Sequence, residues 1–205
     1  MSFIELFKDK FYFIGCDISR QIINYREVKV LNFPKQVLEN LPNPNDISLN
    51  VSSWIQLYNA YASHTKCYFV LTGKISGITV LDFDTIYSYK TFCKNVPNFE
   101  SYFTVRTKNG FHVYCLYNPN LKTGFNVLKN LIHTIDILND MHISILDKKY
   151  FGVICPPSSY YTLNGVFYMY QYLGGTIKPV PDYLFKCLKI LKGRTPISQN
   201  KNLDF

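Results

Sequence analysis

The chain has 205 residues, of which 47% are hydrophobic and 18% are charged. This length and composition exclude a disordered chain and allow a substantial apolar core without support from disulfides. Lys and Arg number 22 against 14 acidic residues, a formal net charge of +8, which favours a polyanionic partner such as a nucleic acid without requiring one.

Neither a membrane span nor a secretory signal is expected. The apolar runs, such as Gly77–Leu81 and Gly152–Cys155, are strand-sized and far shorter than the roughly 20 residues that cross a bilayer. Acidic residues near the N-terminus do not fit a signal peptide, so we expect a cytoplasmic, nuclear or viral-factory location and no secretion. The six cysteines form no C-x-x-C pair and lie mostly in apolar surroundings, which predicts buried free thiols and no zinc site.

The first third of the chain has a mixed pattern. Phe3–Lys10 fits a short amphipathic helix, and the turn-rich segment Leu41–Asp46 ends this region. Ser52 or Ser53 can then cap another helix. Its apolar side would consist of Trp54, Leu57, Tyr58 and Tyr61.

The rest of the chain predicts mainly strands. They are expected at Cys67–Leu71, Ile78–Asp84, Tyr102–Arg106, Phe111–Tyr117, Ile132–Leu138, Tyr150–Cys155 and Val166–Tyr172. A tight turn at Thr72–Gly77 and an Asn-Gly hairpin turn at Lys108–Gly110 join neighbouring strands. Helices are expected from a Thr85 cap to about Lys94 and over Pro181–Leu191. Because hairpins dominate and strands outnumber helices, the sequence predicts an α+β fold.

Three aspartates are candidates for metal binding. Asp82 and Asp84 lie two residues apart on a predicted strand, so both carboxylates project from one face. Asp136, on the strand that contains Ile135–Ile137, joins them if the two strands are neighbours. Clustered carboxylates are costly unless a cation neutralises them, and their oxygens suit Mg²⁺ or Mn²⁺ rather than zinc. The alternative is that each aspartate is simply hydrated.

The predicted hairpin around residue 110 indicates an anion site. His112 follows the turn, Arg106 and Lys108 add positive charge, and the turn offers backbone N–H groups near Asn109–Phe111. Amides, an imidazole and cations together suit a triphosphate. The alternative is an ordinary hairpin with a surface histidine.

Taken together, these segments resemble the primase–polymerase domain of the archaeo-eukaryotic primase superfamily, found at the N-terminus of plasmid, phage and large DNA virus replication proteins. The resemblance runs from about residue 30 to 190, and its blocks occur in the family's order. They are Trp54, the glycine turn and D-x-D strand of Val70–Asp84, the histidine motif of Thr104–Tyr114, and Ile135–Ile137 followed by Ile154–Tyr160 with its Pro-Pro-Ser.

The resemblance implies an architecture and an organisation of the chain. The core would be an RRM-like antiparallel sheet with flanking helices and an N-terminal α/β subdomain. The catalytic domain would occupy residues 1–192, with the α/β part over about 1–76 and the metal-binding sheet over about 77–192. The polar tail 193–205 would be a linker to a fused or associated superfamily 3 helicase.

The resemblance also implies an enzyme, a primase or DNA-directed polymerase. It would use NTPs or dNTPs and two Mg²⁺ or Mn²⁺ ions to synthesise or extend primers on a single-stranded DNA template. Its metal ligands would be Asp82, Asp84 and Asp136. Its nucleotide contacts would be His112, Lys108, Arg106, Asn109, Gly110 and Ser158. The chain departs from the family pattern at two places. Many members have Ser where this chain has Gly110, so a backbone amide would replace that hydroxyl. The segment Asn139–Lys149, between Asp136 and the Pro-Pro-Ser strand, is also longer than in many members.

Two alternatives come from other classes of protein. A non-catalytic single-strand-binding module of a replication initiator would use the aromatic residues, 17% of the chain, to stack bases. Carboxylates facing a phosphate backbone would not help such a module. A replication-initiator nuclease needs an H-x-H pair and a nucleophilic tyrosine, and His112 has no second histidine beside it.

Overall fold

The computed structural model describes residues 3–35, 39, 67–122, 135–138, 143–145, 148–150 and 152–193. Over these residues the fold is α+β with antiparallel sheets and few helices, which confirms the predicted fold class. The described helices are α1 (Phe3–Phe7), α4 (Ile86–Cys93) and α5 (Asp182–Gly193), with a 3-10 turn, η1, at Phe99–Ser101. None of these helices is long and apolar enough to cross a membrane.

A five-stranded antiparallel sheet lies at the centre, in the order β13-β5-β6-β4-β7. Its strands are β4 (Ile78–Phe83), β5 (Phe103–Arg106), β6 (Phe111–Leu116), β7 (Ile135–Leu138) and β13 (Gln171–Gly174). Successive residues of a strand point to opposite faces, so Val80 and its partner Tyr114 project to one side and Leu81 and Phe83 to the other. All of these side chains are buried, so both faces of the sheet are covered.

A four-stranded sheet, in the order β10-β3-β1-β2, covers one face. Its strands are β1 (Phe13–Ile23), β2 (Arg26–Asn32), β3 (Cys67–Leu71) and β10 (Gly152–Cys155). Two-stranded ribbons complete the strands: β8 (Ile143–Ile145) with β9 (Lys148–Tyr150), and β11 (Ser159–Tyr161) with β12 (Phe167–Met169). Because β10 pairs with β3, the two larger sheets do not correspond to two successive stretches of sequence divided near residue 76.

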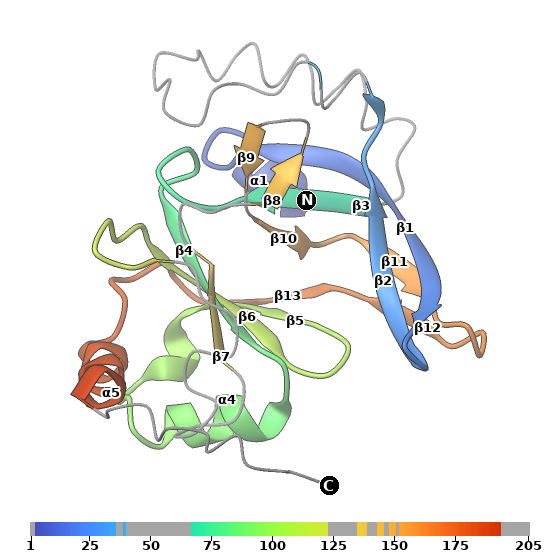
Figure 1. Cartoon of the computed structure of the whole chain (residues 1–205). Coiled ribbons are helices and arrows are strands. Elements are labelled where there is room, and N and C mark those ends of the chain that lie inside the picture. The colour runs from blue at the N-terminus through green and yellow to red at the C-terminus, as the bar shows by residue number, and fades with distance from the viewer. Residues whose placement is uncertain are drawn as a thin grey trace, which may run out of the picture.

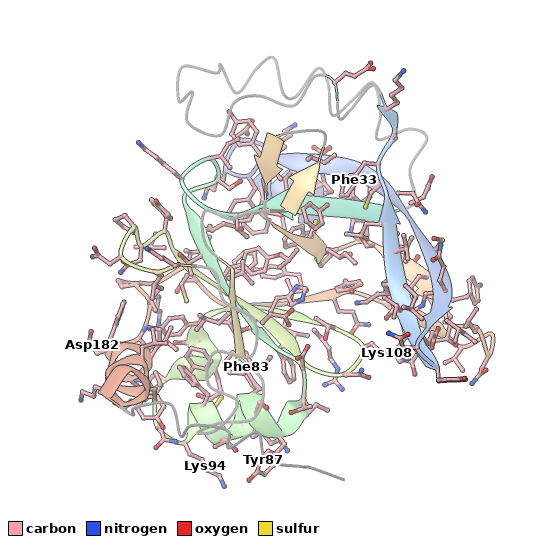
Figure 2. The ribbon with its side chains drawn as sticks, viewed as in Figure 1. Phe33, Phe83, Tyr87, Lys94, Lys108 and Asp182 are labelled. Carbon is pink, nitrogen blue, oxygen red and sulfur yellow. The ribbon has the colours of Figure 1, made fainter. Side chains whose placement is uncertain are left out.

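The layers enclose two apolar cores. Figure 1 shows the four-stranded sheet and α1 on one side of the central sheet, and α4 and α5 on the other. The core between the sheets includes Phe3 and Phe103, whose rings contact each other edge to face. The core under the helices includes Phe83, labelled in Figure 2, together with Phe92 and Leu184. Many of the aromatic residues therefore serve packing.

Several local predictions are confirmed. The hydroxyl of Thr85 accepts a hydrogen bond from the backbone N–H of Ser88 at 3.1 Å and caps α4. All six cysteines are free thiols, and all but Cys93 are buried. The predicted strand Val166–Tyr172 is interrupted at Tyr170, between β12 and β13. The predicted helix carrying Trp54 lies outside the described residues.

The sequence patterns did not predict the long hairpin of β1 and β2. Ile23 pairs with Arg26, so Asn24 and Tyr25 alone form the turn. Their φ angles of 50° and 61° are left-handed, as a type I′ turn requires. The turn is Asn-Tyr rather than the usual Asn-Gly, which explains why its sequence signal is weak.

Candidate functional site

Three predicted residues occupy one row across the central sheet. Asp82 of β4 is the register partner of His112 on β6 and of Asp136 on β7. The strands of Asp82 and Asp136 are therefore neighbours, as the predicted carboxylate cluster required. Asp84 follows directly after the end of β4.

A cleft of about 400 Å³ opens beside this row. Asp82, Asp84 and His112 line one part of it, and Tyr160 of β11 another. The β1–β2 hairpin and the β5–β6 turn complete the lining. They contribute Arg20, Glu27, Val28, Lys29, Thr107, Lys108 and Asn109. Figure 2 shows Lys108 beside the β1–β2 hairpin.

His112 is buried next to Asp82. Its Nε2 lies 3.5 Å from Oδ1 of Asp82, and its Nδ1 is buried. Burial, followed by the nearby charge of Lys29, lowers the pKa of His112 to about 3. The imidazole is therefore neutral at physiological pH, and its contact with Asp82 is not a salt bridge. Nε2 is the nitrogen that lies next to a carboxylate of the cleft lining.

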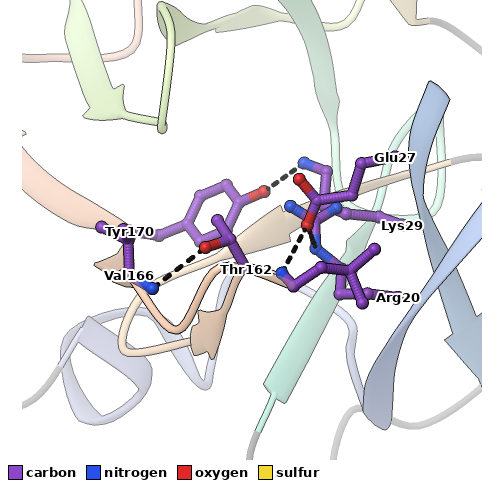
Figure 3. A network of polar contacts seen from close by, with 7 residues as sticks. Arg20, Glu27, Lys29, Thr162, Val166 and Tyr170 are labelled. Carbon is purple, nitrogen blue, oxygen red and sulfur yellow. Dashed lines mark hydrogen bonds and ion pairs between the residues drawn. The ribbon is translucent and has the colours of Figure 1, made fainter.

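Lys29 provides a positive charge that interacts with the aspartates. Its Nζ donates a hydrogen bond to the hydroxyl of the buried Tyr170 at 2.8 Å (Figure 3). Lys29 is exposed as a whole residue, but the surrounding protein shields its ammonium from water, which lowers the pKa of Lys29. The negative charges of Asp82 and Asp84 oppose this shift. Partial burial raises the pKa of Asp84, and Lys29 opposes that shift in turn. The ammonium and the two carboxylates thus stabilise one another's charges.

Arg20 is held from several sides. It is the register partner of Lys29 and projects from the same face of the hairpin. Its Nε lies 3.0 Å from Oε1 of Glu27, and its guanidinium lies 4.5 Å from the centre of the Tyr160 ring. The same Glu27 oxygen accepts the backbone N–H of Leu163 at 3.0 Å, which joins β2 to the β11–β12 loop (Figure 3).

The charges in the cleft come from different elements. Asp82 and Asp84 lie at the end of β4, whereas Arg20 and Lys29 lie on the hairpin and Lys108 on the turn. Carboxylate oxygens are suitable ligands for a hard divalent cation, and separate cations are suitable contacts for a phosphate chain. The described side chains form no group of three metal ligands, and the side chain of Asp136 lies outside those described.

The predicted nucleotide contacts on the β5–β6 turn separate into two groups. Lys108 and Asn109 line the cleft, and the Lys108 ammonium lies 4.9 Å from the centre of the Tyr168 ring. Arg106 does not line it; its guanidinium lies 5.4 Å from the centre of the Phe111 ring. Lys108 and Asn109 therefore remain predicted contacts that line the cleft, whereas Arg106 lies outside its lining.

Gly110 has a different role from the one predicted. Its backbone N–H donates to Oγ1 of Thr107 at 3.0 Å, so this amide is not free to replace a phosphate-binding hydroxyl. Arg106 pairs with Phe111, which leaves a four-residue loop without positive φ angles. The hairpin is confirmed, but glycine is needed for close packing: a Cβ there would lie 1.7 Å from the carbonyl oxygen of Phe83.

Ser158 lies outside the cleft. It is fully buried, and its hydroxyl accepts the backbone N–H of Tyr68 at 2.7 Å and donates to the Tyr68 carbonyl at 3.1 Å. Both hydrogen bonds fasten the segment after Pro157 to β3. The predicted nucleotide contact is corrected to a structural one, because the hydroxyl is inaccessible to a ligand in the cleft.

Arg20, Glu27, Lys29 and Tyr160 were not predicted as site residues. The first three belong to the hairpin that the sequence patterns did not predict, and Tyr160 belongs to a motif whose predicted contact was Ser158. A weak signal exists, because Arg20 and Lys29 are equidistant in sequence from the Asn24–Tyr25 turn that pairs them.

Comparison of the sequence with known protein families and with curated proteins found no match.

Proposed function

We propose that this protein is a template-directed nucleotidyl transferase with a primase–polymerase core, which synthesises or extends primers on single-stranded DNA. The observation that carries the proposal is the register that places His112 and Asp136 on either side of Asp82, at the edge of the cleft. The antiparallel sheet with α4 and α5 on its other face is compatible with the RRM-like core that the sequence resemblance implies.

The positions of the aspartates and the cations on different elements support separate roles for them. Bound by Asp82, Asp84 and Asp136, Mg²⁺ or Mn²⁺ would neutralise charge and make the primer 3′-hydroxyl more acidic. Lys108 and Lys29 would bind the triphosphate and stabilise the negative charge on the departing pyrophosphate. Arg20 would add a planar donor that is already oriented by Glu27 and Tyr160, so little conformational entropy is lost on binding.

His112 would act as a neutral hydrogen-bond donor. With Nδ1 buried, the Nε2 edge would contact the nucleotide or orient Asp82, and neither role requires a charged imidazole. Asn109 would offer its amide to the nucleotide from the turn. Together these groups would position the triphosphate against the primer end, which is the main contribution of a protein to such a reaction.

The test is nucleotide incorporation on single-stranded DNA, with and without a primer. NTPs are compared with dNTPs and Mg²⁺ with Mn²⁺. The double variant Asp82→Asn/Asp84→Asn should lose incorporation, yet remain folded with a melting temperature that changes little without metal, because the lost repulsion between two like charges is offset by the lost attraction to Lys29. The matched control is Asp9→Asn/Asp17→Asn, which removes two exposed aspartates outside the cleft and should keep full activity.

Two outcomes would contradict the proposal. Incorporation that survives in Asp82→Asn/Asp84→Asn would mean that these carboxylates hold no essential metal. A wild-type protein that binds single-stranded DNA but incorporates no nucleotide with either metal would instead support the non-catalytic binding module.

A further inference from the structure

Large apolar side chains are exposed at the tips of two hairpins. Tyr25, in the β1–β2 turn, is fully exposed, and Tyr161 and Phe167, on β11 and β12, are 65% and 51% exposed. We call these three rings and their exposed apolar neighbours the hairpin rim. The neighbours are Ile22, Ile23, Leu163, Val166 and Met169.

The two tips form one continuous surface. Glu27, near the start of β2, accepts the backbone N–H of Leu163 in the β11–β12 loop at 3.0 Å. Figure 1 shows the tip of the β1–β2 hairpin beside the β11–β12 ribbon. Val28 and Tyr160, on the same two hairpins, line the cleft, so the rim begins where the cleft ends.

Strand geometry directs the rim rings away from the core. Tyr160 pairs with Tyr168, and these two rings share the face that meets the cations of the cleft. Tyr161 pairs with Phe167 on the opposite face, with ring centroids 5.2 Å apart. Their exposure therefore follows from the strand register, and no described element packs over them.

The sequence around the rim lacks carboxylates. No Asp or Glu occurs over residues 156–181 or over residues 18–26, although the chain contains 14 acidic residues. Glu27, which follows directly, is engaged by Arg20 and by Leu163. Arg26 lies next to Tyr25 in the chain, and the whole protein carries a net charge of +8. A polyanion would meet no free carboxylate of these segments.

We propose that the hairpin rim is a stacking surface for the bases of single-stranded DNA, which leads the strand to the cleft. Exposed rings without nearby acids suit this ligand, because every base has a face that stacks on an aromatic side chain and the backbone is repelled by carboxylates. The inference rests on the proposed function, in which the strand at the cleft is a single-stranded template. A protein partner or a second copy of this chain would have no need of a carboxylate-free surface.

Binding of labelled oligo(dT), measured by fluorescence anisotropy without nucleotide or metal, tests the proposal. Tyr161→Ala and Phe167→Ala should each weaken binding, roughly five- to a hundredfold, which is the range for loss of one stacked base. Tyr161→Phe keeps the ring and should keep the affinity. Tyr25→Asn removes a ring while supplying a residue that tolerates the left-handed turn, so weaker binding there cannot be attributed to misfolding.

Two controls isolate stacking. Tyr87→Ala removes a ring that is 65% exposed, like that of Tyr161, but lies on α4 away from the hairpins (Figure 2), and should leave affinity unchanged. An abasic oligonucleotide carries the phosphates without the bases, so its affinity should be the same for the wild type and the rim variants. The salt dependence of oligo(dT) binding should also be unchanged, because no phosphate contact is removed.

Three results would overturn the inference while leaving the proposed function intact. The first is that the active wild-type protein does not bind oligo(dT), and the second is that all the rim variants bind it with wild-type affinity. The third result is that the rim variants lose as much affinity for the abasic strand as for oligo(dT). A wild-type dimer that the rim variants convert to monomer, with unchanged DNA affinity, would assign the rim to self-association. Conversely, weakened binding in the rim variants of a wild type that incorporates no nucleotide would support the rim and contradict the proposed catalysis.

Discussion

Replacing Gly110 with serine tests whether the β5–β6 turn is built for close packing or for phosphate binding. Serine would supply the hydroxyl that many members of the primase superfamily, which the sequence resembles, carry two positions before the histidine. If that hydroxyl were all that is missing, nucleotide binding should improve. The structure predicts the opposite, because the new Cβ would lie 1.7 Å from the carbonyl oxygen of Phe83 and under 3 Å from the Phe83 and Asp84 carbonyl carbons.

The magnitude follows from what must move. The atoms that a Cβ would meet are backbone atoms at the end of β4, next to Asp82, and they have no rotamer by which to escape. The turn must therefore shift away from β4, and overpacking of this kind costs about 1–3 kcal/mol of the free energy of unfolding. For a chain of this size, this corresponds to a melting temperature lower by about 2–4 °C per kcal/mol. A displacement of about 1 Å between Lys108 and Asp82 would also reduce incorporation by about a hundredfold.

The assay combines thermal melting with nucleotide incorporation, each on Gly110→Ser and on Gly165→Asn. A Cβ at Gly165 would have no heavy atom within 4 Å, and the φ of 77° suits asparagine, so this control should change stability and activity little. Wild-type stability and incorporation in Gly110→Ser would refute the packing argument. Tighter nucleotide binding would show that the hydroxyl role outweighs the close approach to Phe83.

Two further substitutions separate structure from ligand binding. Ser158→Ala leaves the Tyr68 N–H without its hydrogen bond, so urea unfolding should show a free energy of unfolding lower by about 1–3 kcal/mol. The KM for nucleotide should stay unchanged. A raised KM at unchanged stability would return Ser158 to the nucleotide site. Tyr170→Phe removes the acceptor that orients Lys29, so steady-state kinetics should show the KM for nucleotide rising roughly fivefold, for about 1 kcal/mol, with a smaller change in kcat. Lys29→Met should raise KM further, and an unchanged KM in both variants would remove Lys29 from the triphosphate site.

Strand patterns were sufficient to predict most strands of the central sheet. β4, β5 and β6 are short runs of β-formers, and the β5–β6 hairpin has a recognisable turn, so the antiparallel pairing of β5 with β6 was predictable from local sequence. The D-x-D spacing also placed Asp82 and Asp84 on one face, because side chains alternate along a strand with a period of two. The prediction that Asp136 joins the other two aspartates depended on its strand lying next to β4. Only the structure shows that β7 pairs with β4 and brings Asp136 opposite Asp82.

The cationic part of the cleft was decided by tertiary structure alone. Arg20 and Lys29 lie on a hairpin whose polar and apolar residues alternate imperfectly, and their value as site residues comes from contact with Tyr160 and Tyr170, which are distant in sequence. The roles of Gly110 and Ser158 depend in the same way on the backbones of Phe83 and Tyr68. Local sequence determines which residues form a strand and which face they share, whereas close approach between segments far apart in the chain depends on how the sheets pack.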